Sequence, residues 1–171
     1  NLVQTLLKFA TASGNPGGLN IDLIRIDEVL MRIPASIQKQ DTGFSVSLQF
    51  NDLPEEENKL LVFGNEELLF TSIRNVAVNA CKYSPDHHAE IILTVLPEEF
   101  IVHIIDEGPG IPDSELENIF QPFYRIEETR SIAGFGLGLS LASRIIKLHK
   151  GDIKVESTPG IGTTFELHLP V

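Results

Sequence analysis

The stretch Asn75-Val-Ala-Val-Asn-Ala-Cys-Lys-Tyr83 decides how this chain folds. It lies inside a segment, from about Glu66 to Ser84, whose apolar spacing predicts a helix. The apolar residues that share one face of this helix are Leu69, Ile73, Val76, Ala77 and Ala80. Three polar residues, Asn75, Asn79 and Lys82, follow one another at i, i+4 and i+7 and line up on the opposite side. One face is therefore expected to pack against a core while the other presents a polar row.

The polar row has residue types that suit a metal ion and phosphate groups. An amide oxygen such as that of Asn79 is a neutral hard ligand for Mg²⁺. The ammonium group of Lys82 suits phosphate oxygens. A solvated helix face would carry the same residues, so the row alone leaves both interpretations open. The rest of the chain, with glycine clusters and a carboxylate in a fixed order, favours the first.

The first glycine cluster, Asp106-Glu107-Gly108-Pro109-Gly110, follows a strand pattern. Taken alone it is equally typical of a rigid tight turn. In the functional interpretation Asp106 ends the strand at a cleft, where its carboxylate can accept a hydrogen bond from an exocyclic amine such as that of adenine. Gly108 and Gly110, lacking a Cβ, would let the backbone approach a flat base.

The second cluster, Gly134-Phe-Gly-Leu-Gly-Leu139, opens a predicted helix. Free N–H groups in the first turn of a helix bind phosphate. The dinucleotide fingerprint is excluded because Leu139 stands where its third glycine belongs and no strand precedes the cluster. A Walker A loop is excluded because the chain contains no Gly-Lys dipeptide. The cluster is thus a phosphate loop of another type or a flexible join.

Between Gly110 and Gly134 lie 23 residues, more than the ~12–15 of an ordinary loop. We expect a short helix over Glu115–Phe120, then aromatic anchors around Phe123, and a polar, unpatterned stretch over Glu127–Ala133. This profile is typical of a mobile lid.

The remaining patterns predict strands and helices mixed along the chain, with adjacent strand pairs late in the sequence. We expect an α/β two-layer sandwich in which a mixed, mostly antiparallel sheet of about five strands packs on about three helices. The predicted strands cover residues 19–22, 44–50, 60–63, 89–96, 100–106, 152–157 and 163–169, and the predicted helices cover residues 25–40 with a kink at Pro34, 66–84 and 137–150. Residues 53–58 and the pair His87-His88 are predicted to lie in loops.

Composition bounds the function. The 171 residues suffice for one domain with a good core, and 42% hydrophobic residues argue against disorder. A net charge of −11 without a basic patch argues against a nucleic-acid partner. It leaves room for an anionic ligand, because charges beyond ~8 Å are largely screened. The single Cys81 excludes an intrachain disulfide and favours the cytosol, and no apolar run reaches the length of a membrane span.

The first residues carry a helical stripe, Leu2, Leu6, Phe9 and Ala10, that stops before a Gly/Pro-rich run. A helix of ~12 residues is marginal alone. We therefore expect residues 1–13 to be the end of a longer helix from a neighbouring domain and residues 14–18 to be a hinge. Residues 19–171 then form the main domain.

In this order the pieces resemble the catalytic ATP-binding domain of bacterial sensor histidine kinases, from the superfamily shared with gyrase, Hsp90 and MutL. The resemblance covers about residues 19–171. The matching motifs are Asn75-x-x-x-Asn79-Ala-x-Lys82-Tyr83 (N box), Asp106-x-Gly108-x-Gly110 (G1 box), Phe120-x-Pro-Phe123 (F box), Gly134-x-Gly136-Leu-Gly138-Leu (G2 box) and Gly160-x-Gly162-Thr163-Thr164-Phe165. Five motifs in the correct order and spacing are highly specific.

The resemblance implies a Bergerat-type fold that binds ATP and Mg²⁺. It implies that Asn79 holds the metal, that Asp106 reads the adenine amine and that Arg125 or Arg130 on the lid reaches the γ-phosphate. Asn75 and Lys82 would touch phosphates and Tyr83 would border the nucleoside. The full set of implied ATP-binding residues is Asn75, Asn79, Lys82, Tyr83, Asp106, Gly108, Gly110, Ile111, Arg125, Gly134, Phe135, Gly136, Leu137, Gly138, Leu139 and Thr163.

The chain departs from the wider superfamily in two ways. None of its five histidines lies in the context of a phosphoacceptor, which the family places in a separate dimerising helical domain. The ATPases of the superfamily carry a water-activating glutamate where this chain has Asn75, and a neutral amide cannot act as a general base. The resemblance therefore favours a protein-histidine kinase over an ATPase or serine kinase of the same superfamily; a degenerate nucleotide-sensing module is the alternative outside enzymes.

The partners that the resemblance implies are the protein's own phosphoacceptor and dimerisation domain, in a full-length homodimer, and a response regulator. No nucleic acid and no membrane contact are expected for residues 1–171. The expected location is cytoplasmic, and a membrane anchor elsewhere in the full-length protein is left open.

Overall fold

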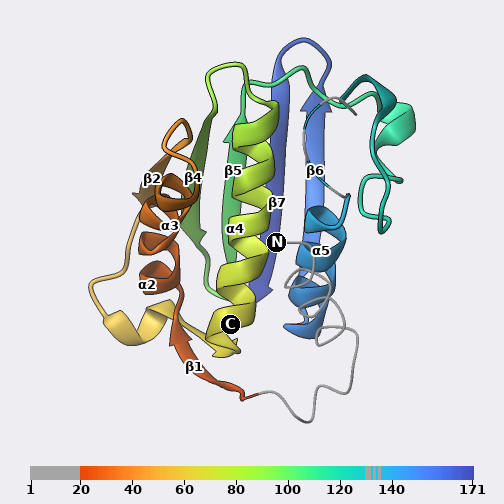
Figure 1. The fold of residues 1–171 in the computed structure, drawn as a ribbon. Helices are drawn as coiled ribbons and strands as arrows, with labels where there is room; N and C mark the ends of the chain where they lie inside the picture. Colours follow the sequence, from red (N-terminus) through yellow and green to blue (C-terminus); the bar gives the residue numbers. More distant parts are fainter. Residues whose placement is uncertain (1–19, 130–131, 133, 135) are drawn as a thin grey trace.

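The structure, a computed structural model, describes residues 20–129, 132, 134 and 136–171. It consists of a five-stranded sheet covered on one face by a layer of helices (Figure 1). The strands of this sheet are β2 (Ser45–Asn51), β4 (His88–Val95), β5 (Glu99–Asp106), β6 (Asp152–Thr158) and β7 (Gly162–Pro170). The helices are α2 (Ile26–Met31), α3 (Ile33–Gln40), α4 (Glu66–Tyr83) and α5 (Gly138–Leu148). The two-layer sandwich predicted from the sequence is confirmed.

The sheet has the strand order β2-β4-β5-β7-β6. β2 runs parallel to β4, whereas the three other pairs are antiparallel. The parallel pair follows from the connection, because the chain crosses the sheet through α4 between these two strands. The sheet is therefore mixed and mostly antiparallel, as predicted. In β5, Phe100, Val102 and Ile104 alternate toward the helices and are fully buried.

α4 is the helix around which the domain is built, and it lies across the middle of the sheet (Figure 1). The five apolar residues predicted to share its inner face are all buried. The Asn65 side chain caps the helix by accepting a hydrogen bond from the backbone N–H of Leu68 at 3.0 Å. The helix ends before Pro85, because the residue preceding a proline disfavours helical backbone angles.

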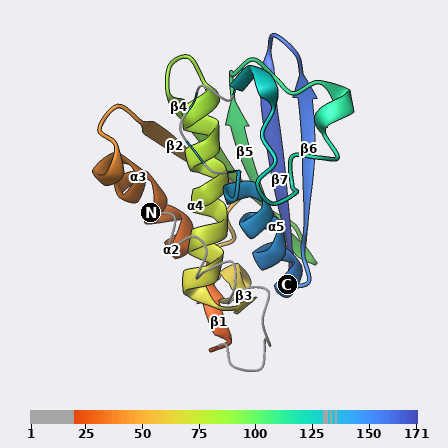
Figure 2. The same ribbon diagram turned by 45° about the vertical axis from the view of Figure 1, so that its right-hand side comes forward.

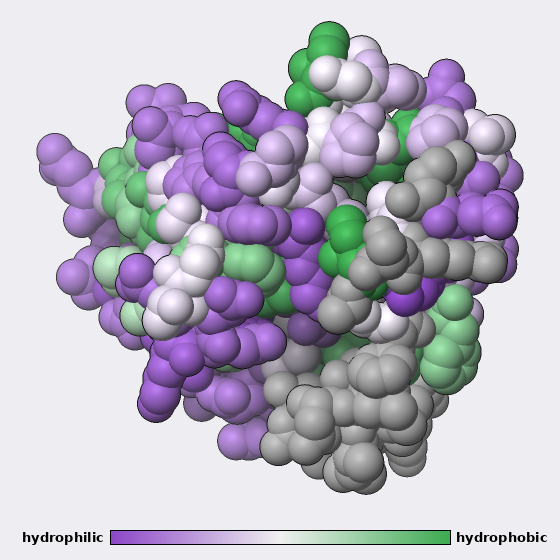
Figure 3. Space-filling model, turned by 45° about the horizontal axis from the view of Figure 1, so that its top comes forward, coloured by the Kyte–Doolittle hydropathy of each residue, from purple (hydrophilic) through white to green (hydrophobic). Residues whose placement is uncertain are grey.

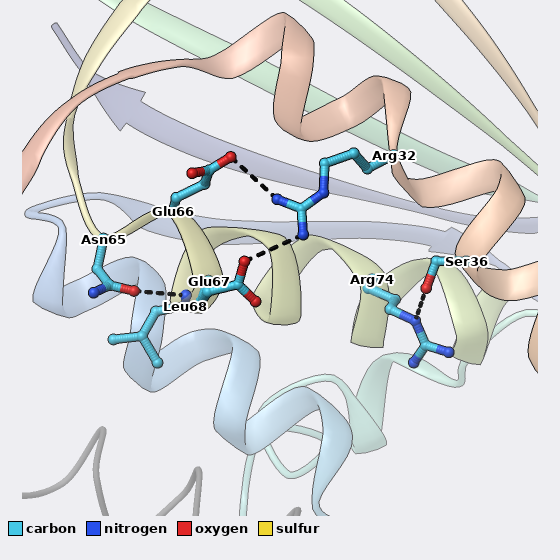
Figure 4. A network of polar contacts seen from close by, with 7 residues as sticks. All are labelled: Arg32, Ser36, Asn65, Glu66, Glu67, Leu68 and Arg74. Atoms are coloured by element: carbon cyan, nitrogen blue, oxygen red, sulfur yellow. Dashed lines mark hydrogen bonds and ion pairs between the residues drawn. The ribbon is translucent and has the colours of Figure 1, made fainter.

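The prediction of one kinked helix over residues 25–40 is wrong. The chain forms two helices, α2 and α3, that meet at Arg32. Pro34 lies in the first turn of α3, where a missing N–H breaks no helical hydrogen bond. Polar contacts join these helices to α4: the Arg32 guanidinium contacts Glu66 at 3.1 Å and Glu67 at 3.2 Å (Figure 4). Further along α4, Arg74 Nε donates to the Ser36 hydroxyl at 2.9 Å.

β1 (Asp22–Arg25) and β3 (Leu61–Gly64) form a separate antiparallel ribbon. The predicted strand over residues 19–22 is therefore displaced toward the C-terminus, and Leu19 lies outside the described residues. The pairing with β3 fixes the observed register. The predicted loop at residues 53–58 is observed over residues 53–56, and a 3₁₀ turn over Glu57–Leu60 follows it. β3 begins one residue later than predicted.

Two other local predictions differ from the structure. The predicted helix over Glu115–Phe120 is absent: a 3₁₀ turn covers Asp113–Glu115, and turns follow it. The stretch between Pro112 and Pro122 is too short to support a helix unless it buries an apolar face, and only Ile119 within it is buried. His88 is not in a loop but begins β4, where it pairs with Ser45 of β2.

The predicted helix end over residues 1–13 and the hinge over residues 14–18 lie outside the described residues. Within the described part of the chain, no helix combines the length and apolar character needed to cross a bilayer.

Candidate functional site

A cleft lies where the C-terminal half of α4, the end of β5, the start of β7 and the start of α5 meet the long loop after β5. Figures 1 and 2 show how these elements are arranged. The space inside the cleft is about 790 Å³, a volume that includes open solvent. The surface at this end of the molecule is mainly hydrophilic with small separate apolar groups (Figure 3). The predicted site residues that line the cleft are Asn79, Tyr83, Asp106, Gly110, Ile111, Arg125, Gly136, Gly138, Leu139 and Thr163.

The start of α5 lies against the polar row of α4. A Cβ placed on Gly138 would be 3.8 Å from Asn79 Oδ1 and 3.9 Å from Asn75 Cβ. The sequence separates these groups by about sixty residues, yet the fold brings the first helical turn of α5 beside the two amides. Free N–H groups at a helix start and side-chain amides together can hold an anion and its metal ion.

Lys82 continues the row toward the loop. A Cβ on Gly134 would lie 3.6 Å from Lys82 Nζ. Burial lowers the pKa of the Lys82 ammonium group, and the nearby positive charge of Arg125 lowers it further. Arg125 lines the cleft and Lys82 lies near it, outside the lining. A polyanion would stabilise two neighbouring cations.

Asp106 ends β5 at the opposite side of the cleft and is 8% exposed. Its Oδ1 accepts a hydrogen bond from the backbone N–H of Gly108 at 2.8 Å. Burial raises the pKa of the Asp106 carboxyl, and the backbone N–H groups of Gly108 and Thr163 partly offset this effect. The carboxylate therefore supports the turn after β5, as the turn interpretation predicts, and also lines the cleft. Its hydrogen bond to the amine of a base stays a prediction.

The turn after β5 is fastened to the hairpin between β6 and β7. The backbone N–H of Gly160 donates to the Pro109 carbonyl at 2.7 Å, and that of Ile111 donates to Ser157 Oγ at 2.7 Å. Gly110 has φ +78°, and a Cβ there would lie 2.5 Å from the Thr158 carbonyl oxygen. Only glycine fits this approach. Sequence reasoning missed Ser157; its pairing opposite Thr163 in the predicted hairpin was the available signal.

The loop between Gly110 and Gly134 is held by the Arg125 side chain. Its guanidinium donates to the backbone carbonyls of Gly134 at 3.0 Å and Thr129 at 3.3 Å, and also to that of Ile132. The Phe123 N–H donates to the Gly136 carbonyl at 2.8 Å. In this structure Arg125 organises the loop, and reaching a phosphate would require exchanging some of these bonds.

Among the other predicted residues, Asn75, Lys82 and Gly134 lie beside the cleft without lining it. Leu137 is buried and does not line the cleft, and Gly108 supports Asp106 from behind. Arg130 and Phe135 lie outside the described residues. The cleft-lining residues that the sequence reasoning did not assign to the site are Ala80, Pro109, Ile119, Tyr124, Ile126, Thr129 and Phe165. These are mostly apolar, and an apolar wall beside Asp106 suits a flat base.

The donor set for a metal ion is limited. Among the residues that the structure describes, no group of three or more His, Cys, Asp or Glu side chains is arranged to hold a metal. Asn79, half-buried and lining the cleft, is compatible with Mg²⁺, because Mg²⁺ keeps several waters and takes further ligands from substrate phosphates.

The model of the family "Histidine kinase-, DNA gyrase B-, and HSP90-like ATPase" matches residues 64–171. The chain belongs to this family. The match includes every part of the cleft described above, and it confirms the family predicted from the five motifs. Within the family the chain is a catalytic ATP-binding domain of the sensor histidine kinase type.

Curated relatives are sensor kinases. The adaptive-response sensory kinase SasA of Synechocystis sp. (strain ATCC 27184 / PCC 6803 / Kazusa) is 38% identical over 146 residues, which cover 84% of this chain and 36% of that protein. The sensor histidine kinase WalK of Bacillus subtilis (strain 168) is 37% identical over 124 residues, covering 70% of this chain and 20% of WalK. The chain thus spans about a third or less of the length of these relatives.

Solved structures show the same fold. The mycobacterial sensor histidine kinase MprB matches with a TM-score of 0.73 and 25% identity over 88% of this chain and 97% of that one. Full-length ShkA in complex with AMPPNP matches with a TM-score of 0.77 and 21% identity over 99% of this chain and 35% of that one. These likenesses confirm the predicted Bergerat-type architecture.

Proposed function

We propose that this chain binds Mg-ATP in the cleft and donates the γ-phosphoryl group to a histidine of a helical phosphoacceptor domain in the full-length protein. The observation that carries the proposal is the arrangement of two chemically different ends in one cleft. Asp106 and an apolar wall form one end. Asn79 and the start of α5 line the other end, and Asn75 and Lys82 lie beside it on the same row of α4, outside the cleft lining. Such a cleft suits a base at one end and metal-bound phosphates at the other.

In the proposed complex Asn79 holds Mg²⁺, which neutralises charge on the phosphates. Lys82 and the N–H groups at the start of α5 bind phosphate oxygens, and Asn75 contacts them from the same helix face. Asp106 accepts a hydrogen bond from the base. The loop that includes Gly134 and Gly136 covers the phosphates. Asn75 occupies the position of the water-activating glutamate of the ATPases. It cannot act as a general base for water, because an amide does not take up a proton at neutral pH.

The partners follow from the same chemistry. The phosphoacceptor domain supplies the nucleophilic imidazole, residues 1–13 are proposed to be the end of one of its helices, and residues 14–18 the hinge to the catalytic domain of residues 19–171. We propose a homodimer of the full-length protein and a response regulator that receives the phosphoryl group, since the relatives are named sensory kinases. A cytoplasmic location suits an ATP-dependent domain whose one cysteine is a buried free thiol.

The test is a single-turnover incubation with γ-labelled ATP. The chain of residues 1–171 is expected to bind ATP, to release phosphate slowly and to remain unlabelled. The full-length protein is expected to acquire acid-labile, base-stable phosphate, which is the signature of phosphohistidine. Phosphate release by the isolated chain at ~1 s⁻¹ or faster would indicate an ATPase. Binding without any transfer by the full-length protein would indicate a nucleotide-sensing module.

A further inference from the structure

A row of three polar side chains crosses the sheet at the level of the cleft. Ser157 of β6 is the direct register partner of Thr163 of β7, which is in turn the register partner of Asp106 of β5. Thr163 and Asp106 line the cleft, and both are more than nine-tenths buried. Ser157 stands behind Thr163, outside the cleft lining. The next row on the same face is apolar and consists of Val155, Phe165 and Ile104.

The hydroxyl of Ser157 makes three hydrogen bonds, which fill its capacity of one donor and two acceptor positions. It accepts from the backbone N–H of Ile111 at 2.7 Å and donates to the Gly162 carbonyl at 3.1 Å. The third contact joins Ser157 Oγ to Thr163 Oγ1 at 2.8 Å. Since the proton of Ser157 is already directed at Gly162, Ser157 can only accept in this contact. Thr163 must therefore donate its single proton to Ser157.

This direction determines what Thr163 offers to a ligand. A threonine hydroxyl has one proton, and in this arrangement the proton points along the sheet, away from the cleft. Only acceptor lone pairs of Thr163 Oγ1 remain for the cleft. Ionised Asp106 beside it is also an acceptor, and its Oδ1 already binds the Gly108 N–H. Asp106 and Thr163, the two adjacent polar side chains at the base end of the cleft, thus both present hydrogen-bond acceptors to a ligand.

We propose that Ser157 is a positioning residue that fixes the direction of the Thr163 hydroxyl and thereby makes the base site selective for a purine with an amino group at position 6. The inference rests on the proposed function, because it requires that the base lies beside Asp106. An exocyclic amine has two N–H donors, one for each acceptor. A carbonyl at the same position would face two acceptors and be repelled. Ser157 itself touches no ligand and acts through Thr163.

The measurement is the dissociation constants of the Mg²⁺ complexes of ATP and inosine triphosphate for the same protein. Inosine has a carbonyl at position 6, a hydrogen on N1 and no 2-amino group. The N1 difference is the same for every variant, so the change in the ATP-to-inosine-triphosphate ratio between wild type and a variant reports on the protein side of the contact. The wild-type chain is expected to prefer ATP. In Ser157→Ala the Thr163 hydroxyl loses its acceptor, and its proton can turn toward the position 6 carbonyl of inosine. The preference for ATP over inosine triphosphate is therefore expected to decrease by about two- to tenfold, the range for one neutral hydrogen bond.

Ser157 also anchors Ile111, so a general loss of stability must be separated from a change in selectivity. Ser72→Ala is the matched control: Ser72 is fully buried and donates to the Ala142 carbonyl at 3.1 Å, away from the cleft lining. Ser72→Ala is expected to lower the melting temperature and to leave the ATP-to-inosine-triphosphate ratio unchanged. Ser157→Thr, which keeps the hydroxyl on a strand, is expected to keep the wild-type ratio.

A double-mutant cycle tests whether Ser157 acts through Thr163. In a Thr163→Val background, Ser157→Ala is expected to change the ratio no further. Thr163→Val alone is informative even if Ser157→Ala does not fold: it should weaken ATP more than inosine triphosphate. If Thr163→Val instead weakened inosine triphosphate more than ATP, Thr163 would donate into the cleft, and the inference would be overturned. A wild-type ATP-to-inosine-triphosphate ratio in folded Ser157→Ala would overturn it as well. A wild-type chain that binds neither nucleotide would instead overturn the proposed function.

Discussion

The Nε2 atom of His149 accepts a hydrogen bond from the backbone N–H of Asn65 at 3.0 Å. The other ring nitrogen, Nδ1, lies 2.7 Å from the Ile145 carbonyl and donates to it. The ring thus joins the C-terminal end of α5 to the residue that caps α4. Because Nε2 must stay unprotonated to accept, the ring is neutral, and burial lowers the pKa of His149 below its ordinary value of 6.5.

This contact predicts a loss of stability in mild acid. Since the pKa of His149 is lower in the folded chain than in the unfolded chain, the unfolded chain takes up the proton first. The stabilisation is therefore complete above the unfolded pKa of ~6.5 and is lost as the pH falls below it through the folded pKa. We expect the melting temperature of the wild-type chain to fall between pH 7.5 and pH 5, and the fall to be smaller in His149→Gln. Ser72→Ala, which loses a buried hydrogen bond but no titratable group, is the control, and it should keep the wild-type slope. Equal slopes in wild type and His149→Gln would contradict this assignment.

Loss of the Asn79 amide should weaken binding of Mg-ATP without unfolding the domain. The side chain lines the cleft and is only half-buried, so Asn79→Ala removes a ligand with little cost in packing. We expect Mg²⁺-dependent ATP affinity to fall by about ten- to a hundredfold, the range for a bond to a charged group, at an unchanged melting temperature. Asn51→Ala, at the exposed end of β2, is the control. Calorimetry that finds unaltered Mg-ATP affinity in Asn79→Ala would remove Asn79 from the metal site.

Arg125 should determine how readily the loop after β5 opens. Its bonds to the carbonyls of Thr129, Ile132 and Gly134 are contacts within the loop. We expect amide exchange over residues 127–133 to be fast without nucleotide and slower with ATP, and Arg125→Gln to accelerate it further. Lys147→Gln removes an exposed charge from α5 and serves as the control. Complete protection of this stretch without nucleotide would contradict a lid.

Local patterns in the sequence were sufficient where one segment determines its own structure. The 3.6-residue spacing around Asn75 gave the buried face of α4, and the alternation in Phe100–Asp106 gave the buried face of β5. The break within residues 25–40 is not visible in the pattern, because the apolar periodicity continues across Arg32, where α2 ends and α3, with Pro34 in its first turn, begins. A pattern of apolar positions does not distinguish a kink from two helices joined end to end.

Contacts between distant segments could not be predicted in the same way. Ser157 in a predicted strand is an ordinary residue until the hairpin register sets it against Thr163 and the loop brings Ile111 to its hydroxyl. Arg125 is one of the two arginines predicted to reach the γ-phosphate, and side-chain chemistry gives no signal for its bonds to backbone carbonyls in the loop. The positions of the site residues along the chain were predictable, whereas their hydrogen-bond partners depended on tertiary structure.

Asp106 carries the most specific prediction, because it has two roles that substitutions can separate. Its Oδ1 accepts the Gly108 N–H, which stabilises the turn, and the carboxylate also faces the cleft. Asp106→Ala removes both acceptors. We expect ATP affinity to fall by about ten- to a hundredfold and the melting temperature to fall as well, since a buried N–H loses its partner. This variant alone would not show which role matters for the base.

Asp106→Asn separates the two roles. Its amide oxygen can still accept the Gly108 N–H, although its NH₂ group cannot accept from the Thr163 N–H, so the melting temperature should fall less than in Asp106→Ala. Its NH₂ group is then left to face the cleft as a donor in place of an acceptor. Adenine offers an N–H at position 6 and guanine a carbonyl, so affinity for ATP should fall while affinity for GTP rises, and the two dissociation constants should converge or cross. If Asp106 served only the turn, Asp106→Asn would leave the ATP-to-GTP ratio where it was, and measuring both nucleotides and the melting temperature on this one variant distinguishes the two outcomes.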